Sequence, residues 1–186
     1  MLLIGGSIAL LTLGGCSAPE RRTVGVEVLI EGNGTFPEAL GGHWQSDKHG
    51  WEFDLAPDGQ ILSAVISLGR VRVVPGRVTT VPTRSADTGV FAPGLWTVHY
   101  DPQARQLTIR ITMDHVRIAM AGNVVEGTST DVFAGPIDPV EGLWQAQWTT
   151  FTRYAARTPE APPVGLSTDP TYGETTPLLF RRAARP

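Results

Sequence analysis

The segment WEFDLAPDGQI at residues 51–61 decides the expected fold of this chain. Its apolar residues Trp51, Phe53 and Leu55 alternate with acidic residues, which is the period of a half-buried β-strand. The Pro57-Asp58-Gly59 that follows is a turn sequence, because proline fixes its own φ and glycine accepts a positive φ. A second apolar run comes directly after the turn and ends at Leu68. We therefore predict a β-hairpin here.

Similar patterns continue along the chain. We expect a second hairpin with arms at residues 95–100 and 107–113, and a third with arms at 71–74 and 78–81 around Pro75-Gly76. In the arm 107–113, the apolar Leu107, Ile109, Ile111 and Met113 should share one face. Other strands are expected at residues 24–30, 116–120, 124–133 and 143–151, with a loop at 84–93.

Many short strands at regular spacing indicate an all-β domain. Because the hairpins follow one another in sequence order, we expect an antiparallel up-and-down meander that closes into a barrel, with a β-sandwich as the alternative. Residues 157–186 have a different composition, since six of the last 30 residues are proline and apolar residues are sparse. We expect a disordered tail at 157–186, after a β domain at residues 24–156.

Residues 1–15 carry no charged side chain, and residues 2–13 form a nearly unbroken apolar run. This run is shorter than the ~20 residues that a membrane-spanning helix needs, and it suits a secretory signal peptide. The segment Leu13-Gly14-Gly15-Cys16 resembles the lipobox of bacterial lipoproteins. The resemblance implies cleavage before Cys16, lipidation of its thiol, and a tether at residues 16–23 that holds the domain to a membrane.

The residue after Cys16 is Ser17 rather than aspartate. In the lipoproteins of Gram-negative bacteria this resembles the signal for transfer to the outer membrane. The resemblance therefore implies a location in the cell envelope, with the protein anchored by lipid to the outer membrane and facing the periplasm.

Gly42-His43-Trp44 resembles the Gly-x-Trp opening of lipocalin-like barrels. In that family the tryptophan packs across the closed end of the barrel, and the interior can hold one small ligand. The resemblance implies a buried Trp44 and a small apolar or amphipathic ligand.

Aromatic side chains are the candidate ligand-binding residues, because apolar and aromatic side chains line most small-molecule pockets. The set is Trp51, Trp96, Tyr100, Trp144 and Trp148. The same residues could instead fill the interior as core, and the sequence leaves this open.

A metal site has weak candidates in His43, Asp47 and His49, because imidazole and carboxylate are good zinc ligands. A polar turn is the commoner role for residues at this spacing. His99 and His115, together with Asp114 or Asp131, could serve acid–base chemistry, but no local motif orients them. We therefore expect no catalytic residues and no cofactor, and we hold a metal-dependent hydrolase as an alternative.

The net charge is −3 and the pI is about 5.8. These values give no electrostatic basis for nucleic-acid binding. The expected partners are a membrane, through the lipid anchor, and a small apolar ligand, while any protein partner is left open. An envelope interaction protein with a filled barrel is the main alternative function.

Overall fold

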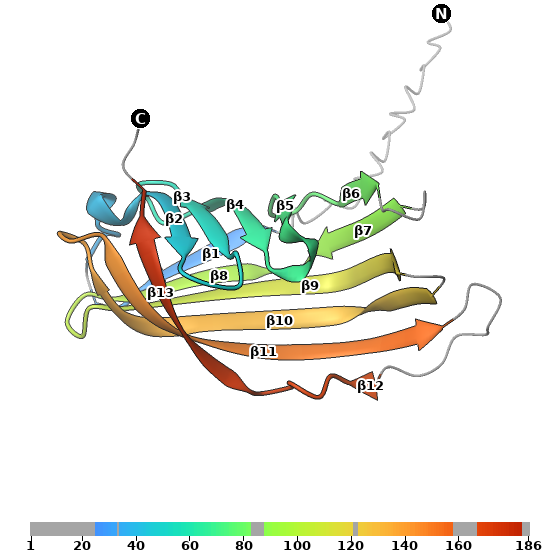
Figure 1. The fold of residues 1–186 in the computed structure, drawn as a ribbon. Coiled ribbons are helices and arrows are strands. Elements are labelled where there is room, and N and C mark those ends of the chain that lie inside the picture. The colour runs from blue at the N-terminus through green and yellow to red at the C-terminus, as the bar shows by residue number, and fades with distance from the viewer. Residues whose placement is uncertain (1–24, 33, 83–87, 121–122, 158–166, 184–186) are drawn as a thin grey trace, which may run out of the picture.

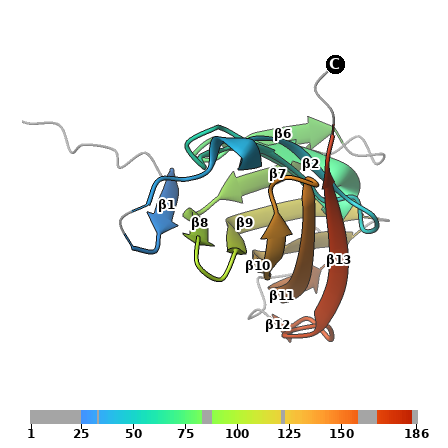
Figure 2. The ribbon, with the colours of Figure 1, turned by 90° about the vertical axis from the view of Figure 1, so that its left-hand side faces the viewer.

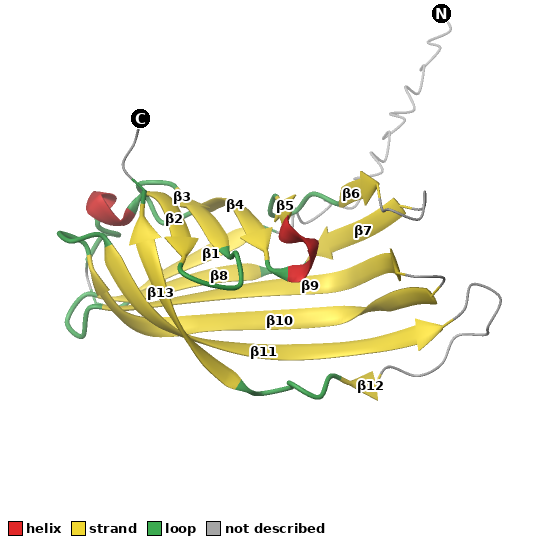
Figure 3. Ribbon diagram, viewed as in Figure 1, coloured by secondary structure: helices red, strands yellow, loops and turns green. Residues whose placement is uncertain are grey.

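The computed structural model describes residues 25–32, 34–82, 88–120, 123–157 and 167–183. The expected signal peptide, Cys16 and the tether lie outside the described residues. The described chain is all-β, as expected, and its helical structure is limited to two short 3₁₀ turns (Figure 3).

Thirteen strands form one sheet. They are β1 (Val26–Ile30), β2 (Gly42–Ser46), β3 (Glu52–Leu55), β4 (Ile61–Ile66), β5 (Val71–Val73), β6 (Thr79–Pro82), β7 (Thr88–Pro93), β8 (Trp96–Asp101), β9 (Gln106–Met120), β10 (Asn123–Asp138), β11 (Leu143–Arg157), β12 (Ser167–Thr168) and β13 (Thr175–Arg182). The 3₁₀ turns are η1 (Glu38–Leu40) and η2 (Leu68–Arg70). The main strand order is β1-β8-β9-β10-β11-β13-β2-β3-β4-β5, with β12 beside β11; β7 pairs with the outer half of β9, and β6 pairs with β7.

Two of the predicted hairpins are confirmed. β3 pairs with β4 around the predicted turn, where Gly59 has a φ of +89°. β8 pairs with β9, and the alternating apolar residues at 107, 109, 111 and 113 are all buried. Because a strand exposes alternate residues to opposite faces, each local pattern was enough to identify the inward face.

The predicted hairpin of residues 71–81 is wrong, and so is the loop at 84–93. β5 pairs with β4, whereas β6 pairs with β7, which begins at Thr88 inside the expected loop. Only an isolated bridge between Val74 and Arg77 joins the two expected arms. The chain turns at Pro75-Gly76, but the strand that follows pairs with the next strand in sequence, β7, instead of returning along β5.

The predicted disordered tail is also wrong for its described part, and the domain therefore continues past residue 156. β13 lies between β11 and β2, in the middle of the sheet. Its inward residues Leu178 and Phe180 are buried, and Phe180 is fully enclosed. Two well-placed apolar side chains and two strand partners outweigh the overall polar composition of the segment.

The topology is only partly a meander. β1 runs parallel to β8, so the sheet is mixed, and β13 separates the two runs of successive strands. The predicted separate strands at 107–113 and 116–120 are one strand, β9. Viewed along the long strands, β8, β9, β10, β11 and β13 follow a curve under β2, β6 and β7 (Figure 2). Hydrogen bonds do not close this curved sheet into a complete ring.

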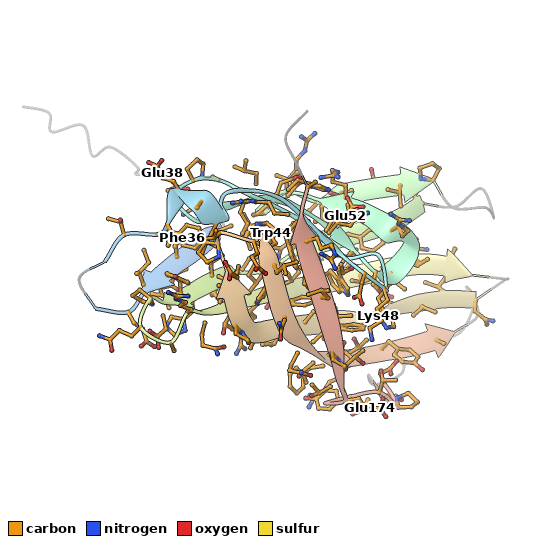
Figure 4. All side chains as sticks on the ribbon, turned by 60° about the vertical axis from the view of Figure 1, so that its left-hand side comes forward. Phe36, Glu38, Trp44, Lys48, Glu52 and Glu174 are labelled. Atoms are coloured by element: carbon orange, nitrogen blue, oxygen red, sulfur yellow. The ribbon has the colours of Figure 1, made fainter. Side chains whose placement is uncertain are left out.

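Aromatic residues fill the interior beneath β2 and β3. Trp44 is fully buried, as expected, and its Nε1 donates a hydrogen bond to the carbonyl of Leu40 (2.8 Å); the residue is marked on β2 in Figure 4. Phe180 stacks on Trp144 with ring centroids 4.8 Å apart, and it also contacts Phe53 at 5.4 Å. This part of the interior is core.

Candidate functional site

The predicted aromatic set divides into two groups. Trp96, Tyr100 and Trp144 are buried in the core, and the indole N–H groups of the two tryptophans donate to backbone carbonyls. Trp51 and Trp148 instead border a cavity of about 410 Å³. The structure therefore brings two of the five candidate ligand-binding residues to one hollow and assigns the other three to packing.

Six parts of the chain surround this cavity, which is open to solvent. The walls come from Trp51, from the β4–η2 segment, and from the inward faces of β9, β10 and β11, with the turn that follows β12 at the rim. Its lining residues are Trp51, Ile66, Ser67, Leu68, Val116, Val125, Gly127, Thr128, Ser129, Asp131, Trp148, Thr150, Thr152, Arg153, Tyr154, Asp169 and Thr171.

Differences in strand length place the cavity at the end of the sheet where the long strands β9, β10 and β11 extend beyond their shorter neighbours. β10 and β11 pair along almost their whole lengths, from Asp138 and Leu143 to Val124 and Arg157. β13 pairs with β11 only as far as Thr149, and the long strands extend past β2, β3 and β4 (Figure 1). The inward side chains of the inner half pack in the aromatic core, while those of the outer half border the cavity.

Asp131 lies in the wall of the cavity and is buried, with 6% of its surface exposed. Its Oδ1 accepts a hydrogen bond from Trp148 Nε1 at 2.9 Å. Burial raises the pKa of Asp131 to about 6, although hydrogen bonds from Trp148, Thr150 and Ser129 act in the opposite direction. In the described part of the chain, no arginine, lysine or histidine forms an ion pair with this carboxyl group.

The two cavity tryptophans are held by aromatic contacts. Trp148 stacks on Phe133 with ring centroids 6.3 Å apart, meets Trp51 edge-on at 5.8 Å, and has His49 at 5.1 Å. Trp51 Nε1 is buried and makes no hydrogen bond in the structure. Trp51 therefore contributes an apolar surface, whereas Trp148 also contributes an N–H group that fixes Asp131.

The candidate metal ligands His43, Asp47 and His49 do not come together. His43 Nδ1 lies 2.6 Å from Asp54 Oδ1, and Asp47 Oδ1 accepts a hydrogen bond from the Leu179 amide (3.0 Å). His49 contacts the ring of Trp148. Across the residues that the structure describes, no group of three His, Cys, Asp or Glu side chains is arranged to hold a metal ion.

The histidines considered for acid–base chemistry are also dispersed. His99 Nε2 lies 3.0 Å from a carboxylate oxygen of Glu31, and His115 Nε2 lies 3.5 Å from one of Glu126. Neither ion pair includes Asp114 or Asp131. The structure thus uses these histidines in exposed pairs on different strands.

A polar network on the outer face of β2 to β5 was not predicted. Asp54 accepts hydrogen bonds from Ser63 Oγ (2.5 Å) and Arg72 Nη1 (2.5 Å), and Arg72 Nη2 also pairs with Glu52 (3.2 Å). Burial tends to raise the pKa of Asp54, but hydrogen bonds from Ser63 and His43 and the charge of Arg72 lower it below its usual value. Because Ser63 donates to a carboxylate rather than to a histidine, this is not a nucleophile–base pair.

A ligand-binding role for Asp131 was not predicted from the sequence. The signal that could have found it is the alternation of β10, where Phe133 and Ile137 face inward and Asp131 occupies the same face. Chemically, the cavity combines an apolar wall with hydroxyl groups and one buried carboxyl group. Such a lining can contact both the apolar and the polar part of a small molecule.

In the described ranges, no helix has both the length and the apolar character of a membrane span. The chain matches no protein-family model, and the comparisons with curated proteins and with solved structures find no match.

Proposed function

We propose that this protein is a lipid-anchored lipoprotein of the bacterial cell envelope whose β domain binds a small apolar or amphipathic ligand. The observation that carries the binding proposal is the cavity of about 410 Å³ beside Trp51 and Trp148. Small-molecule sites have volumes of roughly 300–1,000 Å³ and apolar walls with a few polar groups. The anchoring part of the proposal depends on the lipobox-like residues 13–16 and is independent of the cavity.

The walls of the cavity support an amphipathic ligand in particular. Ile66, Leu68 and Val116 form an apolar side, and Leu68 is half exposed at 48%. Ser129, Asp131 and Thr150 supply hydrogen-bonding groups on β10 and β11. A ligand with an apolar chain and one polar end could contact the apolar residues and the hydrogen-bonding groups at the same time.

A structural or interaction role for the envelope is the second candidate. The dense packing of Phe53, Phe133, Trp144 and Phe180 favours it, because a filled interior needs no ligand for stability. In the first candidate the cavity binds a ligand, whereas in the second it does not. A probe-binding experiment separates the two.

A bulky side chain placed inside the cavity tests the binding proposal. Thr152 lines the cavity, whereas Thr130 lies on β10 next to the inward-facing Asp131 and so faces the other side of the sheet. We expect Thr152→Phe to weaken the binding of an apolar fluorescent probe by the full chain at least about tenfold, since the ring occupies the ligand's volume.

Thr130→Phe is the matched control, because it adds the same ring on the outer face. It should leave the affinity for the probe unchanged. Equal affinities for the wild type and both variants, or no saturable binding by the wild type, would favour the interaction protein instead. Native mass spectrometry of the purified full chain would then identify any ligand that the cavity retains.

A further inference from the structure

The buried carboxyl group of Asp131 is unusual in what surrounds it. In the strand ladder its neighbours are Ile111 on β9 and Thr150 on β11. Its hydrogen-bond donors are the Trp148 indole and the hydroxyl groups of Thr150 and Ser129. All of these groups are uncharged, so the described structure provides no positive charge that compensates the carboxylate.

A buried charge without a counter-charge is costly. Removing a carboxylate from water costs several kcal/mol unless hydrogen bonds or an opposite charge replace the lost hydration. The raised pKa of Asp131, about 6, reflects this cost. At neutral pH the group is nevertheless mainly ionised, and it lies in the wall of an open cavity where a ligand can reach it.

We propose that the cavity binds a primary alkylammonium compound, with the ammonium group on Asp131 and the alkyl chain against Ile66, Leu68 and Val116. The inference rests on the proposed function and specifies the ligand class. An R–NH₃⁺ group donates three hydrogen bonds, which the Asp131 carboxylate and the hydroxyl oxygens of Ser129 and Thr150 can accept. The chain then covers apolar surface that is otherwise open to water.

The other charged groups near the cavity do not supply the missing charge. Arg153 is exposed and its guanidinium group lies over the ring of Tyr172, 5.5 Å from the centroid. Asp169 accepts hydrogen bonds within its own turn from Thr171. His49 contacts the Trp148 ring, with centroids 5.1 Å apart, and Tyr154 is further along β11.

Three ligands with the same alkyl chain test the proposal. Octylammonium, octanol and octyl sulfate share the alkyl chain and carry a cationic, a neutral and an anionic polar group, and their binding to the wild-type full chain can be measured by calorimetry. At about pH 7.5 we expect octylammonium to bind at least about tenfold more tightly than octanol, and octyl sulfate to bind most weakly, since a charge-assisted hydrogen bond is stronger than a neutral one.

The same comparison at about pH 5 needs no mutation. An alkylammonium group keeps its charge there, because its pKa is about 10, whereas Asp131 becomes mainly protonated. The preference for octylammonium over octanol should therefore decrease toward equality. A preference that does not change with pH would assign the cation binding to another group.

Asp131→Asn tests the assignment directly, since asparagine keeps the size and removes the charge. It should abolish the preference for octylammonium and leave octanol binding within about twofold. Asp58→Asn is the matched control, because Asp58 is exposed in the β3–β4 turn and the substitution changes the net charge equally. The control should retain the preference.

The outcomes separate this inference from the proposed function. If the wild type binds octanol and octylammonium equally, or prefers octyl sulfate, the ammonium proposal is wrong while the ligand-binding function stands. If none of the three binds, both are wrong. If Asp58→Asn loses the preference as Asp131→Asn does, the general negative charge of the protein causes it and the Asp131 assignment is wrong.

Discussion

Asp131 shows how one residue can oppose the folding of its own strand. It occupies an inward position of β10, two residues before Phe133, where an apolar side chain would stabilise the core. The hydrogen bond from Trp148 compensates part of the cost of burial, but the pKa is still raised to about 6. Such a cost is typical of binding sites, where a polar group is retained for a ligand.

This shift predicts a specific pH dependence of stability. Between about pH 4 and about pH 6, the folded state keeps the proton on Asp131 while the unfolded state has released it. The free energy of unfolding should therefore fall by about 3 kcal/mol as the pH rises through this window, from the contribution of Asp131 alone. Asp131→Asn should remove that contribution, as measured by urea unfolding of the full chain at both ends of the window.

Asp58→Asn provides the reference for this measurement, since its carboxyl group is exposed. The lowered pKa of Asp54 acts in the opposite direction, but its effect is confined to pH values near and below its usual pKa of 3.8. Identical pH dependence in the wild type and Asp131→Asn would mean that the carboxyl group is not buried as described.

Trp148→Phe isolates the contribution of one hydrogen bond. The substitution keeps an aromatic ring beside Phe133 and removes the Nε1 donor to Asp131. Because this hydrogen bond stabilises the carboxylate, its loss should raise the pKa of Asp131 above its present value of about 6. Carbon-13 NMR of the carboxyl groups measures the change. An unchanged pKa for Asp131 would contradict the contact.

At the level of elements, β13 determines the integrity of the sheet. It pairs with β11 on one side and β2 on the other, so it connects the two runs of successive strands. Pro177 lies within it, opposite Gln147, in the part of β13 that pairs with β11 alone, since the pairing with β2 begins at Phe180. Proline is tolerated where a strand has no partner on one side.

Phe180→Ala should therefore be strongly destabilising. The side chain is fully buried and contacts Phe53, Phe133 and Trp144. We expect the free energy of unfolding to fall by about 3–5 kcal/mol, because the change removes a large ring and leaves a cavity. Truncation after Ala156 removes the whole strand and should prevent cooperative unfolding altogether.

Val140→Ala is the control for Phe180→Ala, since Val140 is 90% exposed. Its effect on urea unfolding should be within about 0.5 kcal/mol. A truncated chain that keeps the melting temperature of the full chain would show that β13 is dispensable.

For the whole molecule, the proposed attachment to a membrane depends on one side chain. Cys16 is the only cysteine in the chain, so a lipid thioether can form at one position alone. Stable attachment needs two or more acyl chains, which a diacylglycerol on this thiol would supply. The described β domain, from residue 25 onward, would then remain outside the bilayer.

Cys16→Ser should abolish the incorporation of labelled palmitate and leave an uncleaved precursor in a bacterial host. Ser17→Ala is the control, because it changes the neighbouring residue and keeps the thiol, and it should be labelled and cleaved normally. Gel mobility reports the cleavage of the precursor, and radiolabelling reports the attachment of the lipid. Normal processing of Cys16→Ser would make the lipoprotein proposal wrong.

The sequence by itself determined the all-β class, the inward faces of individual strands and the position of several turns. Trp51, Phe53 and Leu55 are buried as their alternation predicted, and Gly59 has the positive φ that its turn requires. These features depend on neighbours within a few residues, so a local pattern contains the information.

Only the tertiary structure decided which strands pair at long range. The parallel pairing of β1 with β8, the pairing of β7 with β9, and the insertion of β13 between β11 and β2 join segments that are not consecutive in the chain. Backbone hydrogen bonds do not depend on the side chains, so many partners are locally acceptable and the packing of the whole interior selects among them. The burial of Asp131 and the cavity beside it result from that selection, because they depend on where the long strands extend past the rest of the sheet.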